Sequence, residues 1–262
     1  MDEAAETHRR LESLGFSPAD ASVLAAHFLE AERTGRTGHG LRRVEWLEGW
    51  KELDRGGLET GELEMGELET AARPLRAISE PGYERWDGNG ALGYLVLDQI
   101  VEAQLAEPPA NARVVVAGRT FPTGMLGHWT RRLAEGGLVA ALTATSPRRL
   151  GHPAGGPKLT GTNPLSIAIP SSDGRPLVTD VSMGNLTYGD VLAGRATEAD
   201  LEPFGAPQAH KAFALAAGLQ LFVDALTPDD GFGAVLVVAR PAADPVPAFR
   251  ELAAGARLPG DR

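Results

Sequence analysis

The chain has 262 residues, with 35 acidic and 25 basic side chains, six histidines and no cysteine. The lack of cysteine excludes disulfides, thiolate nucleophiles, iron–sulfur clusters and cysteine-ligated zinc. A formal net charge of −10 argues against a nucleic-acid partner, because phosphate binding needs concentrated Lys and Arg. No run of about 18 apolar residues predicts a transmembrane helix, and the charged N-terminus is unlike a secretory signal. We therefore expect a cytoplasmic protein without a membrane partner.

The first third of the chain has the pattern of helices. Apolar spacing predicts three of them, over about 4–14, 21–31 and 41–53. Ser17-Pro18 is typical of an N-cap followed by the first helical residue. A repeat rich in glycine and glutamate over 57–70 indicates a solvated loop. We expect residues 1–75 to form a mainly helical N-terminal part.

From residue 75 the pattern changes to strands alternating with helices. Further helices are predicted over about 92–105, 125–133 and 211–226. Apolar runs predict strands over about 113–117, 138–143, 165–169, 177–179 and 234–239. This alternation predicts an α/β fold for residues 76–240. Residues 241–262, rich in proline, alanine and glycine, are expected to form a short flexible tail.

Several well-known site motifs are missing from the sequence. No G-x-G-x-x-G follows a strand and opens a helix, so the Rossmann dinucleotide fingerprint is absent. The P-loop, the G-x-S-x-G nucleophile elbow and the H-E-x-x-H zinc motif are absent as well. With six scattered histidines and no cysteine, we expect no metal site.

The first polar cluster with the residues for catalysis is Gly38-His39-Gly40, followed by Arg43. His39 and Arg43 are four residues apart, so one helical turn would place an imidazole and a guanidinium at one pocket. Arginine binds carboxylates through two hydrogen bonds, and histidine exchanges protons near neutral pH. The pair therefore suits a small 2-oxo acid, although a loop histidine beside a solvated arginine explains the same residues.

Two further polar clusters lie in the second half of the chain. Gly161-Thr162-Asn163-Pro164 precedes a strand, and its hydroxyl, amide and backbone N–H groups suit a cofactor as well as a simple turn. His210-Lys211 begins an apolar helix, where an anion such as phosphate would use both the lysine and the helix N-terminus. A free surface lysine is the alternative there.

The order of these clusters resembles the malate/L-lactate dehydrogenase family of the second type. The resemblance runs from about residue 11 to 249. The family includes ureidoglycolate, sulfolactate and diketogulonate dehydrogenases and the Δ1-piperideine-2-carboxylate reductases. The motifs that carry it are Ala31-Glu-Arg-Thr-Gly35 before His39, Asp87-Gly88-Asn89-Gly90, Gly155-Gly156, Gly161-Thr162-Asn163-Pro164, Leu177-Val-Thr-Asp180 and the segment from His210 to Ala216. The resemblance implies the non-Rossmann nicotinamide-binding fold of that family and an intertwined homodimer.

The resemblance also implies NAD(P)H-dependent reduction of a C=O or C=N group, with a 2-oxo acid or cyclic imine as the small-molecule substrate. Residues 1–75 would carry His39, the general acid, and residues 76–240 would bind cofactor and substrate. Asp180 would orient His39, and Arg43 would hold the substrate carboxylate. The residues that would contact the cofactor are Gly161, Thr162, Asn163, Thr120, Ser182, His210 and Lys211.

Several positions depart from the family pattern. Gly38 stands where the family has serine, and Pro122 stands where it has a substrate-facing histidine. Asp190 replaces a lysine, a segment between about 195 and 207 is shortened, and so is the C-terminus. Two interpretations follow: a reductase with a reshaped pocket, or a descendant without redox activity that serves in binding, assembly or other chemistry.

Overall fold

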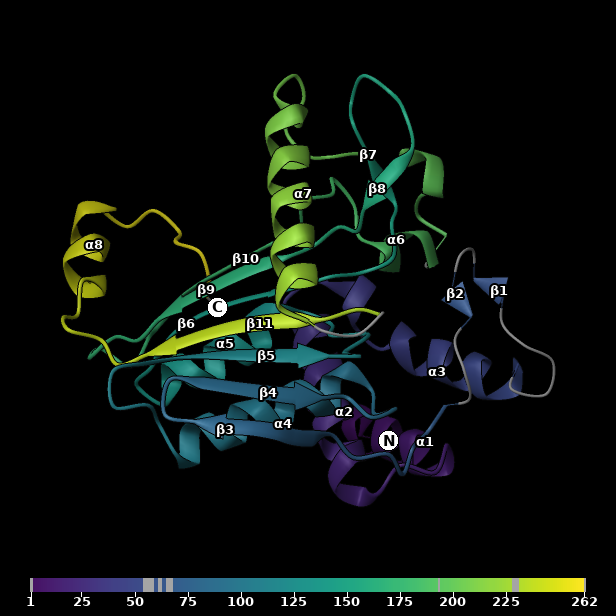
Figure 1. Cartoon of the computed structure of the whole chain (residues 1–262), viewed down its shortest axis with the longest axis horizontal. Helices are drawn as coiled ribbons and strands as arrows, with labels where there is room; N and C mark the ends of the chain where they lie inside the picture. The colour runs from purple at the N-terminus through teal and green to yellow at the C-terminus, as the bar shows by residue number, and fades with distance from the viewer. Residues whose placement is uncertain are drawn as a thin grey trace.

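Figure 1 shows the computed structural model, which describes residues 2–53, 59–60, 63–64, 68–192, 194–227 and 231–261. Its helices are α1 (Glu3–Ser13), α2 (Pro18–Arg33), η1 (Thr37–His39), α3 (Arg42–Leu53), α4 (Gly93–Ala106), α5 (Leu126–Glu135), α6 (Tyr188–Leu192), η2 (Glu198–Asp200), α7 (Ala209–Leu226) and α8 (Val246–Leu252). Its strands are β1 (Glu59–Thr60), β2 (Leu63–Glu64), β3 (Leu75–Glu80), β4 (Tyr83–Asp87), β5 (Ala112–Gly118), β6 (Val139–Ala144), β7 (Leu150–Gly151), β8 (Lys158–Thr160), β9 (Leu165–Ile169), β10 (Leu177–Val181) and β11 (Ala234–Ala239). The glycine–glutamate repeat predicted as a loop lies largely outside the described residues.

A seven-stranded mixed sheet forms the centre of the molecule, in the order β10-β9-β6-β11-β5-β4-β3. Its pairs are antiparallel except for β4 and β5, which run parallel. Because β5 and β6 both pair antiparallel with β11, these two strands point the same way. The ends of β5, β6 and β10 and the start of β9 consequently lie at one end of the sheet.

The two faces of the sheet are covered differently. Along β5, Val115 and Ala117 face the main core with helices α4 and α5, whereas Val116 packs with Val223 of α7. This alternation is the period of two expected for a strand buried on both faces. Figure 1 shows α7 crossing the face opposite to α4 and α5.

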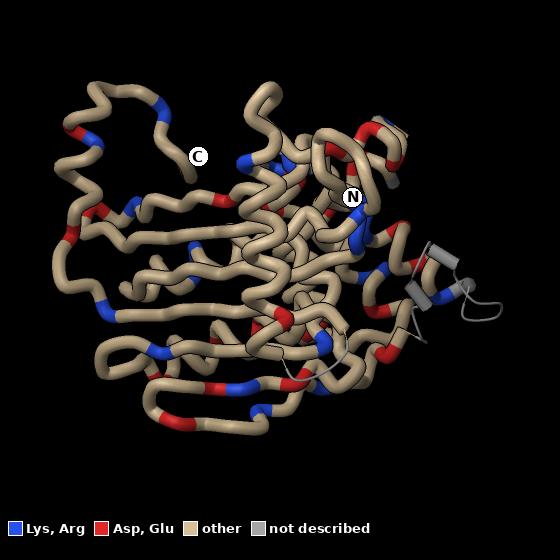
Figure 2. The backbone as a smooth tube through the Cα atoms, turned by 45° about the horizontal axis from the view of Figure 1, so that its top comes forward, with Lys and Arg blue, Asp and Glu red and all other residues tan. Residues whose placement is uncertain are grey.

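The central strands carry few charges. Figure 2 shows them almost entirely tan, with Lys, Arg, Asp and Glu distributed over helices, loops and outer strands. The sequences of β6, β9 and β11 contain none of these four residue types. Burying such strands stabilises the fold by about 25 cal/mol for each Å² of apolar surface removed from water.

Glu84 in β4 is a buried exception, with no exposed surface. Its carboxylate accepts hydrogen bonds from Trp86 Nε1 at 2.9 Å and Gln104 Nε2 at 3.0 Å. It also pairs with Arg113 Nη1 at 3.0 Å and with Arg76. Two guanidinium groups and two neutral donors thus satisfy this charge in the interior, as a buried carboxylate requires.

The helices expected from apolar spacing are confirmed, and Ser17 caps α2 by accepting from the backbone N–H of Asp20. Strands β3 and β4 were not predicted, because their sequences LRAISE and YERWD lack an apolar run. The segment after Pro241 differs from the expected flexible tail. It forms α8, and the backbone oxygens of Pro259 and Gly260 accept hydrogen bonds from Val178 N and Arg131 Nη2.

Candidate active site

A cavity of about 110 Å³ lies at the sheet end where β5, β6 and β10 finish. We call it the central pocket, and its wall comprises Arg36, His39, Arg43, Tyr94, Phe121, Pro122, Thr123, Gly124, Met125, Thr145, Ser146, Pro147, Arg149, Thr162, Pro164, Asp180, Ser182, Thr187 and Tyr188. These residues come from η1, α3, α4, α6 and the loops at the strand ends. The sheet thus brings together segments from the whole length of the chain.

His39 and Arg43 both line the central pocket, as their spacing predicted. Arg43 is only 8% exposed, donates from Nε to the Gly38 carbonyl at 3.0 Å and lies 5.6 Å from the ring of Trp46. No carboxylate pairs with Arg43 among the described residues. His39 is half-buried, and its Nδ1 is buried without a hydrogen-bond partner. The pocket therefore contains a guanidinium and an imidazole nitrogen that are both available to a ligand.

The protonation state of His39 follows from these surroundings. Burial is the largest cause that lowers its pKa from 6.5 to about 3, and the positive charges of Arg43 and Arg36 contribute in the same direction. The carboxylate of Asp190 opposes this effect. The imidazole is consequently neutral at pH 7, with one N–H donor and one acceptor nitrogen.

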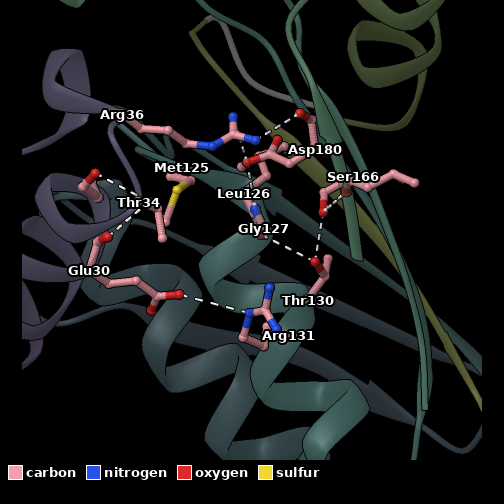
Figure 3. A network of polar contacts seen from close by, with 12 residues as sticks. Glu30, Thr34, Arg36, Met125, Leu126, Gly127, Thr130, Arg131, Ser166 and Asp180 are labelled. Atoms are coloured by element: carbon pink, nitrogen blue, oxygen red, sulfur yellow. Dashed lines mark hydrogen bonds and ion pairs between the residues drawn. The ribbon is translucent and has the colours of Figure 1, made fainter. Parts of the chain in front are cut away.

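Asp180 also lines the central pocket, and Figure 3 shows the polar contacts around it. Its Oδ2 accepts from the Gly127 N–H at 2.9 Å and lies 3.7 Å from Arg36 Nη1. Burial raises the pKa of Asp180, while the Gly127 hydrogen bond and the Arg36 charge lower it. The structure thus brings His39 and Asp180 to one cavity. Among the described contacts, however, this carboxylate bonds to Gly127 and Arg36 and not to the imidazole.

Asp190, which stands where the family resemblance expects a lysine, binds residues of its own segment on either side of the short helix α6. Its Oδ2 accepts from Thr187 N and Oγ1 at 2.9 and 2.8 Å, and Oδ1 pairs with Arg195 at 2.6 Å. A Cβ added at Gly38 would lie 2.6 Å from Thr187 Oγ1 and 3.3 Å from the backbone of Gly189. The close approach of α6 therefore explains why glycine, and not serine, precedes His39.

The segment Gly161-Thr162-Asn163-Pro164 divides its residues between the pocket and the interior. Thr162 lines the pocket, whereas Asn163 is fully buried and donates to Ala216 O at 3.1 Å and Gln220 Oε1 at 3.0 Å. Gly161 lies outside the pocket wall and donates from its N–H to Gln220 Oε1 at 3.4 Å. Gly161 and Asn163 thus anchor to α7 the loop that presents Thr162.

The remaining residues predicted to contact the cofactor are spread more widely. Ser182 lines the pocket. Thr120 is fully buried outside the pocket wall, and its hydroxyl donates to Gly118 O at 3.0 Å. His210 and Lys211 are exposed at the start of α7, also outside the wall. Contact of these three residues with a cofactor remains a prediction.

Sequence reasoning missed three notable side chains of the pocket. Tyr94, at the start of α4, is 1% exposed, and its hydroxyl is buried without a partner. Arg36 pairs with Asp180, and Arg149 stacks on Tyr188 with the guanidinium carbon 3.5 Å from the ring centre. None of these three residues belongs to a sequence motif. Their closeness in sequence to the family motifs was the only signal that could have predicted their place in the pocket.

Comparison with known proteins shows the family. The family model described as malate/L-lactate dehydrogenase matches residues 2–210, and the chain belongs to this family. Its fold is that of several solved dehydrogenases and reductases. A dehydrogenase from Sinorhizobium meliloti superposes with a TM-score of 0.78 at 24% identity, covering 98% of this chain and 87% of that one. The Δ1-piperideine-2-carboxylate reductase of Pseudomonas syringae superposes with a TM-score of 0.77 at 22% identity, covering 98% and 89%.

The similar curated proteins are dehydrogenases and reductases. A (2R)-3-sulfolactate dehydrogenase (NADP(+)) from Chromohalobacter salexigens is 28% identical over 71% of this chain and 52% of its own length. A Δ1-pyrroline-2-carboxylate/Δ1-piperideine-2-carboxylate reductase from Pseudomonas putida is 29% identical over 81% of this chain and 66% of its own. The chain thus spans about half to two thirds of the length of these relatives. Among the described residues, no helix is long and apolar enough to cross a bilayer.

Proposed function

We propose that this chain reduces a C=O or C=N group next to a carboxylate, with NADH or NADPH as the hydride donor. The observation that supports this most directly is the central pocket, where His39 Nδ1 has no hydrogen-bond partner and Arg43 has no carboxylate partner among the described residues. Buried polar groups without partners cost stability, so they are retained where a ligand supplies the missing bond. The relatives' names indicate oxo acids and imines as the substrate class.

The charge of the pocket favours an anionic substrate. Arg36, Arg43 and Arg149 line it, and Asp180 is the carboxylate in its wall. Arg36 is engaged by Asp180, and Arg149 pairs with Glu198 at 3.6 Å, whereas Arg43 has no such partner. Arg43 is therefore the side chain that we assign to the substrate carboxylate, through the paired hydrogen bonds that a guanidinium offers.

The residues present also fit a nicotinamide dinucleotide. Thr162, Ser146 and Ser182 place three hydroxyl groups in the pocket wall, and Ser146 Oγ lies 3.4 Å from Thr162 Oγ1. Hydroxyl groups suit the carboxamide of a nicotinamide, and the Arg149 guanidinium suits a phosphate. When bound, this cofactor supplies the hydride, while the protein supplies binding, orientation and charge.

His39 would act as a neutral ring. Because its pKa is about 3, it is not an imidazolium at pH 7. A neutral imidazole can still donate one N–H hydrogen bond to the carbonyl oxygen or imine nitrogen and so polarise the bond under attack. This differs from the general acid implied by the family resemblance, which would need a charged ring to give up a proton readily.

Fluorescence titration with NADH and with NADPH tests the proposal. Saturable binding, followed by substrate-dependent loss of reduced-nicotinamide absorbance, would support a reductase. The assay should include 2-oxo acids and cyclic imines, since the pocket chemistry accommodates both. If neither dinucleotide binds, the proposal fails, and a descendant without redox activity becomes the better interpretation.

We also propose a homodimer. Helix α7 exposes several large apolar side chains, with Leu215 54%, Leu221 68% and Phe222 46% exposed. An uncovered apolar face of this kind usually marks an interaction site, and a symmetric second copy is its commonest occupant. Light scattering at micromolar concentration tests this proposal. A monomer, or a dimer unaffected by Leu221→Glu, would contradict the assignment to α7.

A further inference from the structure

Tyr94 lines the central pocket, and its buried hydroxyl has no role in the function proposed above. Its side chain is almost completely buried at 1% exposure, and its hydroxyl has no hydrogen-bond partner. In a folded interior such a group is rare, because losing water without gaining a bond is costly. Since Tyr94 lines the central pocket, a ligand there can supply the missing partner.

The ring of Tyr94 is held in a fixed position. His27 and Phe28 of α2 pack edge-on against it, with ring centres 4.9 and 5.3 Å away. Gly124 permits this arrangement: with φ of +68°, it would place an added Cβ 2.3 Å from the Tyr94 ring and 2.5 Å from His27. Only glycine at position 124 therefore leaves room for the Tyr94 ring in this position.

The groups that surround Tyr94 leave it as the proton donor at neutral pH. His39 on η1 has a pKa of about 3, and the pKa of His27 on α2 is also far below its ordinary value because of burial, so both rings are neutral. Arg43 on α3 does not deprotonate. Burial raises the pKa of Tyr94 itself, with Arg43 opposing, so the phenol keeps its proton.

Two other positions at this pocket are less suited to the role. Asp180 on β10 has a raised pKa, but its Oδ2 is occupied by the Gly127 N–H and faces Arg36. Pro122 occupies the position that the family resemblance gives to a substrate-facing histidine, and proline has no side-chain proton. Tyr94, by contrast, has a buried hydroxyl at this pocket with no hydrogen-bond partner.

We propose that the Tyr94 hydroxyl contacts the substrate oxygen or nitrogen next to the carboxylate and donates the proton that completes the reduction. This inference rests on the proposed function. The substrate carbon accepts a hydride from the reduced nicotinamide, and the π pair of the C=O or C=N bond moves to the heteroatom. That atom takes the phenolic proton of Tyr94, and solvent returns one proton to the phenolate. The sum is substrate, reduced cofactor and one proton giving the hydroxy or amino acid and oxidised cofactor.

The first test needs no turnover. Pyruvate and isobutyrate have nearly the same shape, but only pyruvate has an oxygen next to the carboxylate. Calorimetric titration of both ligands into wild type and Tyr94→Phe, without cofactor, isolates the hydroxyl. We expect Tyr94→Phe to weaken pyruvate binding about tenfold, the scale of a hydrogen bond to a strong acceptor, and to leave isobutyrate unchanged within about twofold. Equal effects on both ligands, no effect on pyruvate, or a wild type that does not prefer pyruvate would overturn the proposal.

The second test uses turnover. With NADPH and the best substrate of wild type, Tyr94→Phe should lower kcat by about 10²- to 10⁴-fold, the range for a lost general acid, while its NADPH affinity stays unchanged. A kcat within about threefold of wild type would refute the assignment. Thermal unfolding controls for the fold: Tyr94→Phe removes a hydroxyl without a partner, so its midpoint should equal or exceed that of wild type. If wild type binds neither dinucleotide, the proposed function fails, and the pyruvate comparison still decides whether Tyr94 is a ligand donor.

Discussion

The neutral state of His39 makes a quantitative prediction for stability against pH. The pKa of this group is 6.5 when the chain is unfolded and about 3 when it is folded, because burial and the charges of Arg43 and Arg36 disfavour the imidazolium. Between these values the unfolded chain binds one proton that the folded chain does not. Stability is therefore fully present above about pH 6.5 and is lost progressively as the pH falls toward 3.

The magnitude follows from the same two values. A pKa difference of one corresponds to about 1.4 kcal/mol, so lowering the pH from 7 to 5 should remove about 2 kcal/mol of unfolding free energy through His39. His39→Gln removes the titrating group and keeps a polar side chain of similar size. Urea unfolding of both proteins at pH 7 and pH 5 gives the four free energies that are needed.

The difference between the two proteins isolates His39. His27 also has a lowered pKa, but its contribution is the same in wild type and variant and cancels. We expect wild type to lose about 2 kcal/mol more than His39→Gln between pH 7 and pH 5. If both proteins lose the same free energy of unfolding, the pKa of His39 in the folded protein is close to its ordinary value of 6.5. The neutral-ring role would then be wrong, and an imidazolium acid would again be available.

Three further substitutions test the site and its support. Arg43→Ala should raise the KM for a carboxylate substrate by about 10- to 100-fold, the scale of a charged hydrogen bond, whereas Arg42→Ala outside the pocket wall should leave it within about twofold. Glu84→Gln should lower the unfolding free energy by about 3 kcal/mol, because two guanidinium groups lose their buried counter-charge. As a control, Glu80→Gln at an exposed position of β3 should change it by less than about 0.5 kcal/mol. Gly38→Ser should destabilise by about 1–3 kcal/mol, because the added atoms collide with α6.

The measurements for these variants are direct. Initial rates over a substrate series give KM for the arginine pair, and urea unfolding gives the free energies for the others. Equal KM for wild type and Arg43→Ala would remove Arg43 from carboxylate binding. If the Glu84→Gln protein is as stable as wild type, the guanidinium groups of Arg76 and Arg113 do not depend on the Glu84 carboxylate and are hydrated instead. A stable, fully active Gly38→Ser would mean that α6 moves away without cost.

One consequence of the neutral ring concerns the pH dependence of the reaction. If His39 gave up a proton as an imidazolium, activity would fall as the pH rises through its ordinary value near 6.5. With His39 neutral and Tyr94 as the donor, kcat/KM for reduction should stay constant between pH 6 and pH 8. A tenfold fall over this range, absent in His39→Gln, would contradict the assignment.

Much of this protein could be predicted from local sequence alone. Helix positions followed from apolar spacing and from caps such as Ser17, since these signals lie within a few residues of the structure that they specify. The placement of His39 and Arg43 at one pocket followed from their four-residue spacing, although η1 ends at His39 and α3 begins at Arg42, so no continuous helical turn joins them. The motif order was enough to indicate the family.

The tertiary structure decided what these residues can do. The carboxylate of Asp180 bonds to Gly127 and Arg36 because strand β10 places it beside α5, and no local pattern contains that placement. The low pKa of His39 arises first from burial, which only the folded chain provides, and then from its sequence neighbours Arg43 and Arg36. Tyr94 belongs to no motif, and its hydroxyl became notable only when packing left it buried without a partner. Sequence spacing determines local geometry, whereas desolvation and long-range contacts depend on how the whole chain packs.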